Sequence, residues 1–69
     1  MERVKITTEF ITLGQLLKCC SIISSGAMAK DFLLENEVKV NNETENRRGR
    51  KIYPGYTVIA AGREIKVEK

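Results

Sequence analysis

The centre of the chain, from Val38 to Lys51, reads Val-Lys-Val-Asn-Asn-Glu-Thr-Glu-Asn-Arg-Arg-Gly-Arg-Lys. It predicts a short strand, a tight turn and a basic cluster, residues 47–51, which has no apolar side chain to bury. From Lys39 to Lys51 there are five basic and two acidic residues, whereas the rest of the chain has seven of each. The whole net charge of +3 therefore lies in this stretch. Such a local excess predicts an anion-binding surface, and the commonest large polyanion in a cell is nucleic acid.

The length of 69 residues predicts one domain over residues 1–69. A chain this short buries only about 60% of the surface that it exposes when unfolded, so its core is thin and leaves no room for a deep catalytic cleft. Hydrophobic residues make up 42% of the chain and charged residues 30%. This balance is ordinary for a folded protein and too apolar for a disordered one.

In residues 1–6 charged side chains are interleaved with apolar ones, which argues against a signal peptide. No apolar run approaches the roughly 20 residues needed to cross a bilayer. Cys19 and Cys20 are adjacent, so they cannot join distant segments by a disulfide. Without histidine or a second cysteine pair, a structural zinc site is not expected either. We therefore expect a cytoplasmic protein without a membrane segment, metal or cofactor. Cys20 should lie in the core and Cys19 should be partly covered.

A first helix is expected between Ile11 and Cys20. Thr12 and Gln15 form the Thr-x-x-Gln pattern of a capping box, and Ile11 and Leu16 are placed to form a hydrophobic staple around it. The apolar stripe at helical spacing consists of Leu13, Leu16, Leu17 and Cys20.

A second helix is expected from a cap at Ser24 or Ser25 to about Asn36, a residue that can end a helix in a left-handed conformation. Its apolar face would consist of Met28, Ala29, Phe32 and Leu33. Two short helices joined this closely must pack together, because neither stripe can be covered otherwise.

Alternating apolar residues predict strands at residues 3–7, 38–40, 57–59 and 63–67. Turns are expected at Asn41-Asn42, where a hairpin begins, at Ala61-Gly62, and at Pro54-Gly55, the central pair of a type II turn. The predicted fold class is α+β, with two short packed helices against a small, mainly antiparallel β-sheet.

This order of elements resembles the S-four RNA-binding domain, also called the alpha-L motif, over residues 12–59. The residues that carry the likeness come from both helices, the central strand and the turn beyond the basic cluster: Leu13, Leu16, Leu17, Ser25, Ala29, Lys30, Val38-Lys39-Val40-Asn41, Pro54-Gly55 and Thr57-Val58. Residues 45–51 are most similar to the small stand-alone members of the YaaA/YbcJ type.

The resemblance implies binding of structured RNA, above all ribosomal RNA or the ribosome, and a role in ribosome assembly or quality control. The residues expected to contact RNA are Arg47, Arg48, Arg50, Lys51, Lys39, Asn41, Lys30, Ser25 and Lys18. Arginine suits this task because its planar fork grips phosphate oxygens in pairs. The arginines that the family usually carries beside its two helices are replaced here by Thr12 or Leu13 and by Gly26. We therefore expect the basic cluster to carry more of the binding.

Other interpretations of the sequence stay open. The arginines of the basic cluster could pair with Glu43 and Glu45 in a solvated loop, and Lys18 and Lys30 could be ordinary solvated helix charges. The protein could instead be an interaction module for an acidic partner. Tyr53 and Tyr56 could stack on bases, although their place beside Pro54-Gly55 favours a packing role. No nucleophile with a nearby base and no acid/base pair is visible, so we expect a monomeric binding protein rather than an enzyme.

Overall fold

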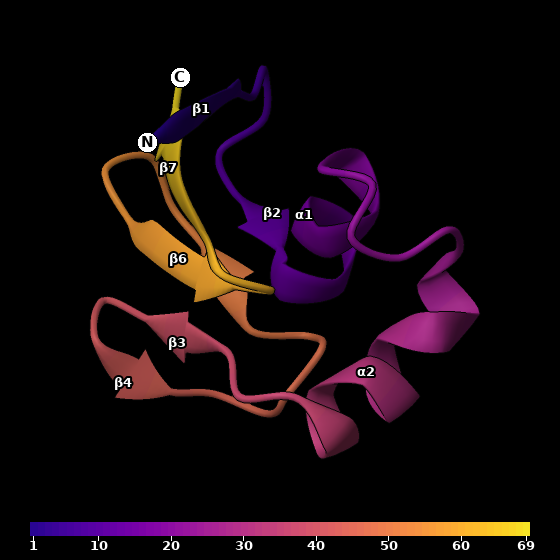
Figure 1. Ribbon diagram of the computed structural model, residues 1–69. Coiled ribbons are helices and arrows are strands. Elements are labelled where there is room, and N and C mark those ends of the chain that lie inside the picture. Colours follow the sequence, from indigo (N-terminus) through magenta and orange to yellow (C-terminus); the bar gives the residue numbers. More distant parts are fainter.

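Five strands of the computed structural model, which describes residues 1–69, form a sheet in the order β1-β7-β6-β3-β4 (Figure 1). They are β1 (Glu2–Lys5), β7 (Arg63–Glu68), β6 (Thr57–Ala60), β3 (Lys39–Val40) and β4 (Glu43–Thr44). The first pair, β1 and β7, is parallel, and all other neighbours in this sheet are antiparallel. Two further strands, β2 (Ile11–Thr12) and β5 (Lys51–Ile52), form a separate antiparallel ribbon.

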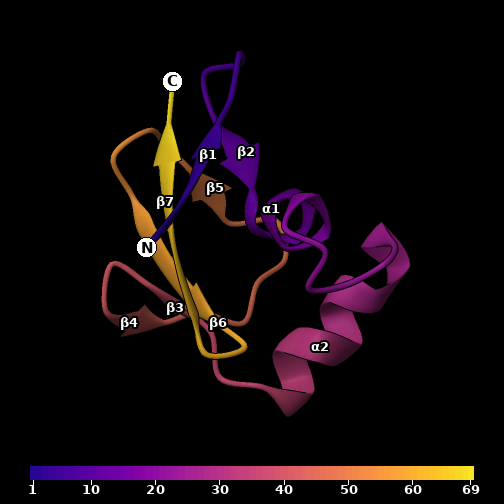
Figure 2. The same ribbon diagram turned by 45° about the horizontal axis from the view of Figure 1, so that its top comes forward.

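The two α-helices, α1 (Leu13–Cys19) and α2 (Ala29–Glu35), lie against each other on one side of the sheet (Figure 2). A 3₁₀ turn, Gly26–Met28, leads into α2. The predicted α+β class with two short packed helices and a mainly antiparallel sheet is confirmed. Neither helix has the length and apolar character that crossing a membrane would require.

The start of α1 follows the predicted capping box. The Gln15 backbone N–H donates to Thr12 Oγ1 at an N···O distance of 3.3 Å, and Gln15 Oε1 accepts from the Thr12 backbone N–H at 3.0 Å. The predicted stripe is buried, with Leu13, Leu16 and Leu17 fully inaccessible and Cys20 close to it. Cys19, which we expected to be partly covered, is exposed instead.

The start of the second helix differs from the prediction. Ser25 occupies the N-cap position of the 3₁₀ turn, but its side chain makes no capping hydrogen bond, while the Ser24 hydroxyl donates to Met28 Sδ. Because regular α-helix begins only at Ala29, Met28 lies off the buried face and is 45% exposed.

The rest of α2 keeps its expected apolar face, with Ala29 and Leu33 buried and Phe32 half-buried. The helix does not end in a left-handed residue. Asn36 is extended, with φ −131°, and its side-chain amide donates back to the Phe32 carbonyl oxygen. The asparagine therefore ends the helix with an extended backbone, and its backbone N–H, at 2.9 Å, and its side-chain amide, at 3.1 Å, both donate to the Phe32 carbonyl oxygen.

All three predicted turns are present. The β3–β4 hairpin turns at Asn41 and Asn42, both with positive φ, and the β6–β7 hairpin turns in the same way at Ala61 and Gly62. At Pro54-Gly55 the glycine has φ 97°, and the Tyr56 N–H donates to the Tyr53 carbonyl oxygen across the turn. A positive φ favours asparagine and glycine, because a β-carbon disfavours it in most other residues. Ala61, with φ 52°, adopts it despite its β-carbon.

One hydrophobic core of 15 buried residues joins the sheet to the helices. Val38 and Val40 both point into it, as predicted, and so do Ile65 and Val67 of β7. At the start of the chain, β1 ends at Lys5 rather than at residue 7. Ile6, directly after it, is buried and donates its N–H to the Glu68 carbonyl oxygen.

Candidate nucleic-acid interface

The loop between β4 and β5, residues 45–50, carries all of the basic cluster except Lys51, the first residue of β5, and is tied by its backbone to the start of α1. The Leu13 N–H donates to the Arg50 carbonyl oxygen at 2.8 Å, and the Gly14 N–H donates to the Arg48 carbonyl oxygen at 2.9 Å. The first N–H groups of a helix have no hydrogen-bond partner within the helix. These two bonds give the Leu13 and Gly14 N–H groups their partners, and they also hold the loop in place. At the other end of the loop, the Glu45 N–H donates to the Val38 carbonyl oxygen at 2.8 Å.

Gly14 lies where α1, the start of α2 and this loop meet. A β-carbon added at Gly14 would lie 3.4 Å from the Ala29 β-carbon and 3.4 Å from the Arg48 carbonyl oxygen. The missing side chain lets the loop and the start of α2 approach α1 together. Lys30, one of the expected contact residues, directly follows Ala29 and is exposed.

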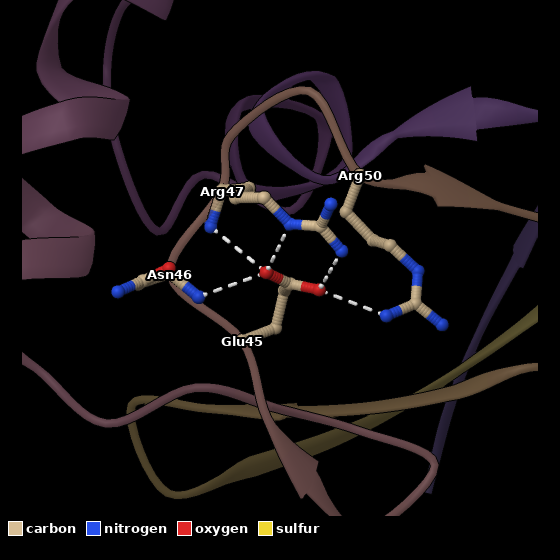
Figure 3. A network of polar contacts seen from close by, with 4 residues as sticks. All are labelled: Glu45, Asn46, Arg47 and Arg50. Carbon is tan, nitrogen blue, oxygen red and sulfur yellow. Dashed lines mark hydrogen bonds and ion pairs between the residues drawn. The ribbon is translucent and has the colours of Figure 1, made fainter.

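The Glu45 carboxylate is the hydrogen-bonding centre of the loop, and Glu45 is only 7% exposed (Figure 3). Its Oε2 accepts from Arg47 Nε at 3.0 Å and from the backbone N–H groups of Asn46 and Arg47, both at 3.1 Å. Its Oε1 accepts from Arg47 Nη2 at 3.1 Å and from Arg50 Nη1 at 2.8 Å. One carboxylate thereby fixes two of the three arginines of the cluster.

These bonds lower the pKa of Glu45 to about 2. The side-chain hydrogen bond from Arg47 has the largest effect, and those from Arg50 and from the Arg47 backbone add to it. Together they outweigh burial, which alone would raise the pKa of a carboxyl group. Glu45 is therefore charged at any physiological pH, and the pKa values of Arg47 and Arg50 are raised by the same contacts.

The interpretation that the arginines pair with acidic neighbours holds in part. Arg47 and Arg50 form ion pairs with Glu45, whereas Glu43 is exposed and forms none. Arg48 and Lys51 form no ion pair. The paired arginines keep free donors, because a guanidinium has five N–H groups and Glu45 takes two from Arg47 and one from Arg50. The Arg47 side chain is also 71% exposed, so its pairing fixes it without hiding it.

An open groove of about 470 Å³ lies beside the basic cluster. Its lining consists of three cations, two aromatic side chains and one glycine: Arg47, Gly49, Arg50, Lys51, Tyr53 and Tyr56. The Tyr53 ring lies 5.7 Å from the Phe10 ring and 5.8 Å from the Tyr56 ring, measured between centroids, and Lys51 Nζ lies 5.0 Å from the Phe10 centroid. The tyrosines thus pack against neighbouring side chains, which is the role that their place beside Pro54-Gly55 favoured, and they also line the groove. Phe10 had no predicted role, and no motif marked it.

The remaining expected contact residues lie away from this groove lining. Lys39 is half-buried in β3, between β4 and β6. The Asn41 side chain is already hydrogen-bonded within the sheet, because its Oδ1 accepts from the Thr57 N–H at 3.0 Å. Ser25 is half-buried before the 3₁₀ turn, and Lys18 is exposed in the last turn of α1, opposite the end that the loop caps. The structure therefore gathers Arg47, Arg50 and Lys51 at the groove. Arg48 is exposed but is not part of the groove lining, and its β-carbon lies beside Gly14 of α1. The nine predicted residues thus do not form one surface.

Residues 4–68 match the family model described as the S4 domain, and the chain therefore belongs to the S4 domain family. It is 58% identical over 59 residues to a protein of Bacillus subtilis (strain 168) named "Probable ribosome maturation protein RlbA", an alignment that covers 86% of this chain and 83% of that protein. It is also 40% identical over 57 residues to the "Putative RNA-binding protein YbcJ" of Escherichia coli (strain K12), covering 83% of this chain and 81% of that protein.

Proposed function

We propose that this protein binds structured RNA, with ribosomal RNA as its target, through the basic cluster on the β4–β5 loop. It acts as a monomeric, cytoplasmic, non-catalytic protein in ribosome assembly or quality control, and residues 1–69 form its single RNA-binding domain. The observation that carries the proposal is the fixed geometry of the cluster, whose backbone caps α1 and whose arginines Arg47 and Arg50 are held by Glu45. The names of the two relatives support the RNA target and the link to ribosomes.

A fixed cluster suits phosphate binding for two physical reasons. Ordering a long arginine side chain costs conformational entropy, and Glu45 has already ordered two of them before any RNA arrives. The N–H groups left over on these guanidinium groups can still donate to phosphate oxygens, while Arg48 and Lys51 add charges without an acidic partner. Binding of this kind releases counterions from the RNA and weakens as salt rises.

Arg48→Ala is the most direct test, because Arg48 forms no ion pair and its loss leaves Glu45 satisfied. We expect about a fivefold or larger loss of affinity for purified ribosomal RNA at about 0.1 M salt, and a log-log salt slope flatter by about one unit. The matched control is Arg3→Ala, which removes the same charge from β1, where Arg3 pairs with Glu68. Equal effects of the two variants in filter binding would contradict the assignment to the basic cluster.

Nuclease treatment separates this proposal from binding to an acidic protein partner. Association with ribosomal particles should be lost when their RNA is digested by ribonuclease before the protein is added. Retention on the digested particles, at the same protein concentration, would favour a protein partner instead.

A further inference from the structure

We propose that the groove beside the basic cluster holds one unpaired nucleotide of the bound RNA, with its base against Tyr53 and Tyr56 and its phosphate against Lys51 and Arg50. The inference rests on the proposed RNA-binding function and specifies which RNA feature that function recognises. An RNA with a bulged, looped or terminal nucleotide would be preferred over a continuous duplex.

The groove has the size and chemistry for such a ligand. Its volume of about 470 Å³ falls within the range of roughly 300–1,000 Å³ that is typical of small-ligand sites. Three of its six lining residues are cations and none is acidic. Glu45 is the acidic group in contact with this lining, and both of its oxygens are covered by hydrogen bonds from Arg47, Arg50 and the loop backbone. An anionic group in the groove therefore meets donors rather than a carboxylate.

The aromatic side of the groove is ordered before any ligand arrives. Tyr53 packs between Phe10 and Tyr56, with interplanar angles of 48° and 57°, and Tyr56 also packs against the hydrophobic core. Tilted pairs of this kind are favourable, so they hold the rings in place. Both tyrosines are still partly exposed where they line the groove. A base can stack on such a surface whatever its identity, because every base has an aromatic face.

Arg50 connects the aromatic side of the groove to the cationic side. It donates to Glu45 through Nη1 at 2.8 Å and lines the groove together with both tyrosines. Arg47, Arg50, Lys51 and the tyrosines therefore form one surface, across which a nucleotide presents its phosphate and its base to different residues.

Gly49 keeps one wall of the groove free of a side chain. Its φ is not positive, and an added β-carbon would meet no atom within 4 Å, so neither the backbone nor the packing requires glycine here. A larger side chain at this position should be accepted by the fold and should narrow the groove without changing any charge.

The ligand must be unpaired, because a base within a duplex is stacked on both faces and cannot reach the tyrosines. RNA-binding proteins stack aromatic side chains on bases in loops, bulges and ends for this reason. The basic cluster alone would read only phosphates, whereas the groove adds a contact that a continuous helix cannot make.

Two RNA hairpins of equal stem length, one continuous and one with a single bulged nucleotide, test the inference by direct binding. The wild-type protein should bind the bulged hairpin at least about fivefold more tightly, as expected for one base stacked on an aromatic side chain. Tyr53→Leu should abolish this preference, whereas Tyr53→Phe, which keeps the ring, should retain it. Gly49→Leu should also abolish the preference for the bulged hairpin. If Tyr53→Leu fails to fold, the Gly49→Leu variant tests the nucleotide site in its place.

Equal affinity of the wild-type protein for the two hairpins would overturn the nucleotide site and leave the proposed RNA binding standing. The nucleotide site is overturned in the same way if neither hairpin binds under conditions in which ribosomal RNA does, or if Gly49→Leu keeps the full preference. Displacement of the bulged hairpin by an equal concentration of a free nucleoside monophosphate would show a site for free nucleotides instead. Loss of binding to every RNA, ribosomal RNA included, would overturn the proposed function as well.

Discussion

Glu45 decides which cations of the basic cluster are held in ion pairs and which are not. Its carboxylate holds Arg47 through two side-chain hydrogen bonds and Arg50 through one, while Arg48 and Lys51 stay outside this network. A buried carboxylate needs such partners, because an unpaired charge away from water is costly. Alanine at Arg47 and Arg50 together would therefore disturb the loop as well as any RNA contact, which makes Arg48 the cleaner probe.

Glu45→Gln should lower the free energy of unfolding by about 1–2 kcal/mol at pH 7. The amide keeps the size of the side chain but loses the charge that holds both arginines, and the effect is limited because Arg47 is largely in water. Glu43→Gln is the matched control, since Glu43 carries the same charge nearby, is exposed and forms no ion pair. It should change the stability by less than about 0.5 kcal/mol. Urea denaturation measures both, and equal effects would contradict the role of Glu45.

The stability difference between wild type and Glu45→Gln should depend on pH. The pKa of Glu45 is about 2 in the folded protein and near 4.5 when the side chain is free. A lowered folded pKa adds stability above the unfolded value, and this stability is lost as the pH falls through the folded value. The stability difference between wild type and Glu45→Gln should therefore shrink between about pH 5 and pH 2. Urea denaturation at each pH measures this stability difference. If it stayed constant between about pH 5 and pH 2, the charge of Glu45 would not be the source of the stability that Glu45→Gln removes.

Sequence patterns predict the cations of this site better than their partners. Arg47, Arg48 and Arg50 are visible as a run of charge, and an exposed run is the simplest expectation because nothing in it is apolar. Glu43 and Glu45 look equivalent in the sequence, yet the fold exposes one and buries the other. Which of them is buried depends on where β4 ends and the loop crosses α1, and no local pattern records that.

At the level of elements, the two helix starts show where local reasoning succeeds. The capping box of α1 involves only Thr12 and Gln15, so a short piece of sequence contains the whole interaction. The remaining N–H groups at this helix start bind carbonyl oxygens of Arg48 and Arg50, which are distant in the chain. The start of α2 differs from its prediction because the 3₁₀ turn at Gly26–Met28 satisfies its backbone without the serine side chains. Capping chemistry is predictable where it is local and not elsewhere.

The contact of α1 with the loop predicts a specific effect of substituting Gly14. Gly14→Val adds a β-carbon at the limit of contact with Ala29 and Arg48, and its two methyl groups must displace the loop or the start of α2. We expect a loss of about 1–3 kcal/mol in stability, as for other overpacked sites. We also expect increased amide hydrogen exchange at Gly14, whose N–H donates to Arg48.

Gly26→Val is the control for this substitution. A β-carbon at Gly26 would meet no atom within 4 Å, so only the conformational preference of valine should matter there. If both variants lost the same stability, the proposed close approach at Gly14 would have no energetic weight.

On the scale of the whole molecule, the two ends of the chain form one edge of the sheet. β1 pairs in parallel with β7, and Glu2 and Arg63 form an ion pair between these two strands. Alternation of charged and apolar residues predicted both strands but could not predict that they pair, because pairing is a long-range choice. The core shows the same division. Apolar periodicity predicts the buried face of each element, whereas the neighbour that covers this face depends on the assembled fold.

The dimensions of the molecule also separate local binding from general electrostatic attraction. Its extents are 29 × 22 × 17 Å, while salt at about 0.1 M screens charges over roughly 10 Å, so a charge on a distant strand cannot replace one in the basic cluster. The double variant Arg48→Ala/Glu64→Gln tests this, because Glu64 is exposed on β7 and its loss restores the net charge to +3. We expect its affinity for ribosomal RNA and its salt slope to equal those of Arg48→Ala alone. Recovery of the wild-type affinity and slope in the double variant would mean that overall charge, rather than the basic cluster, attracts the RNA.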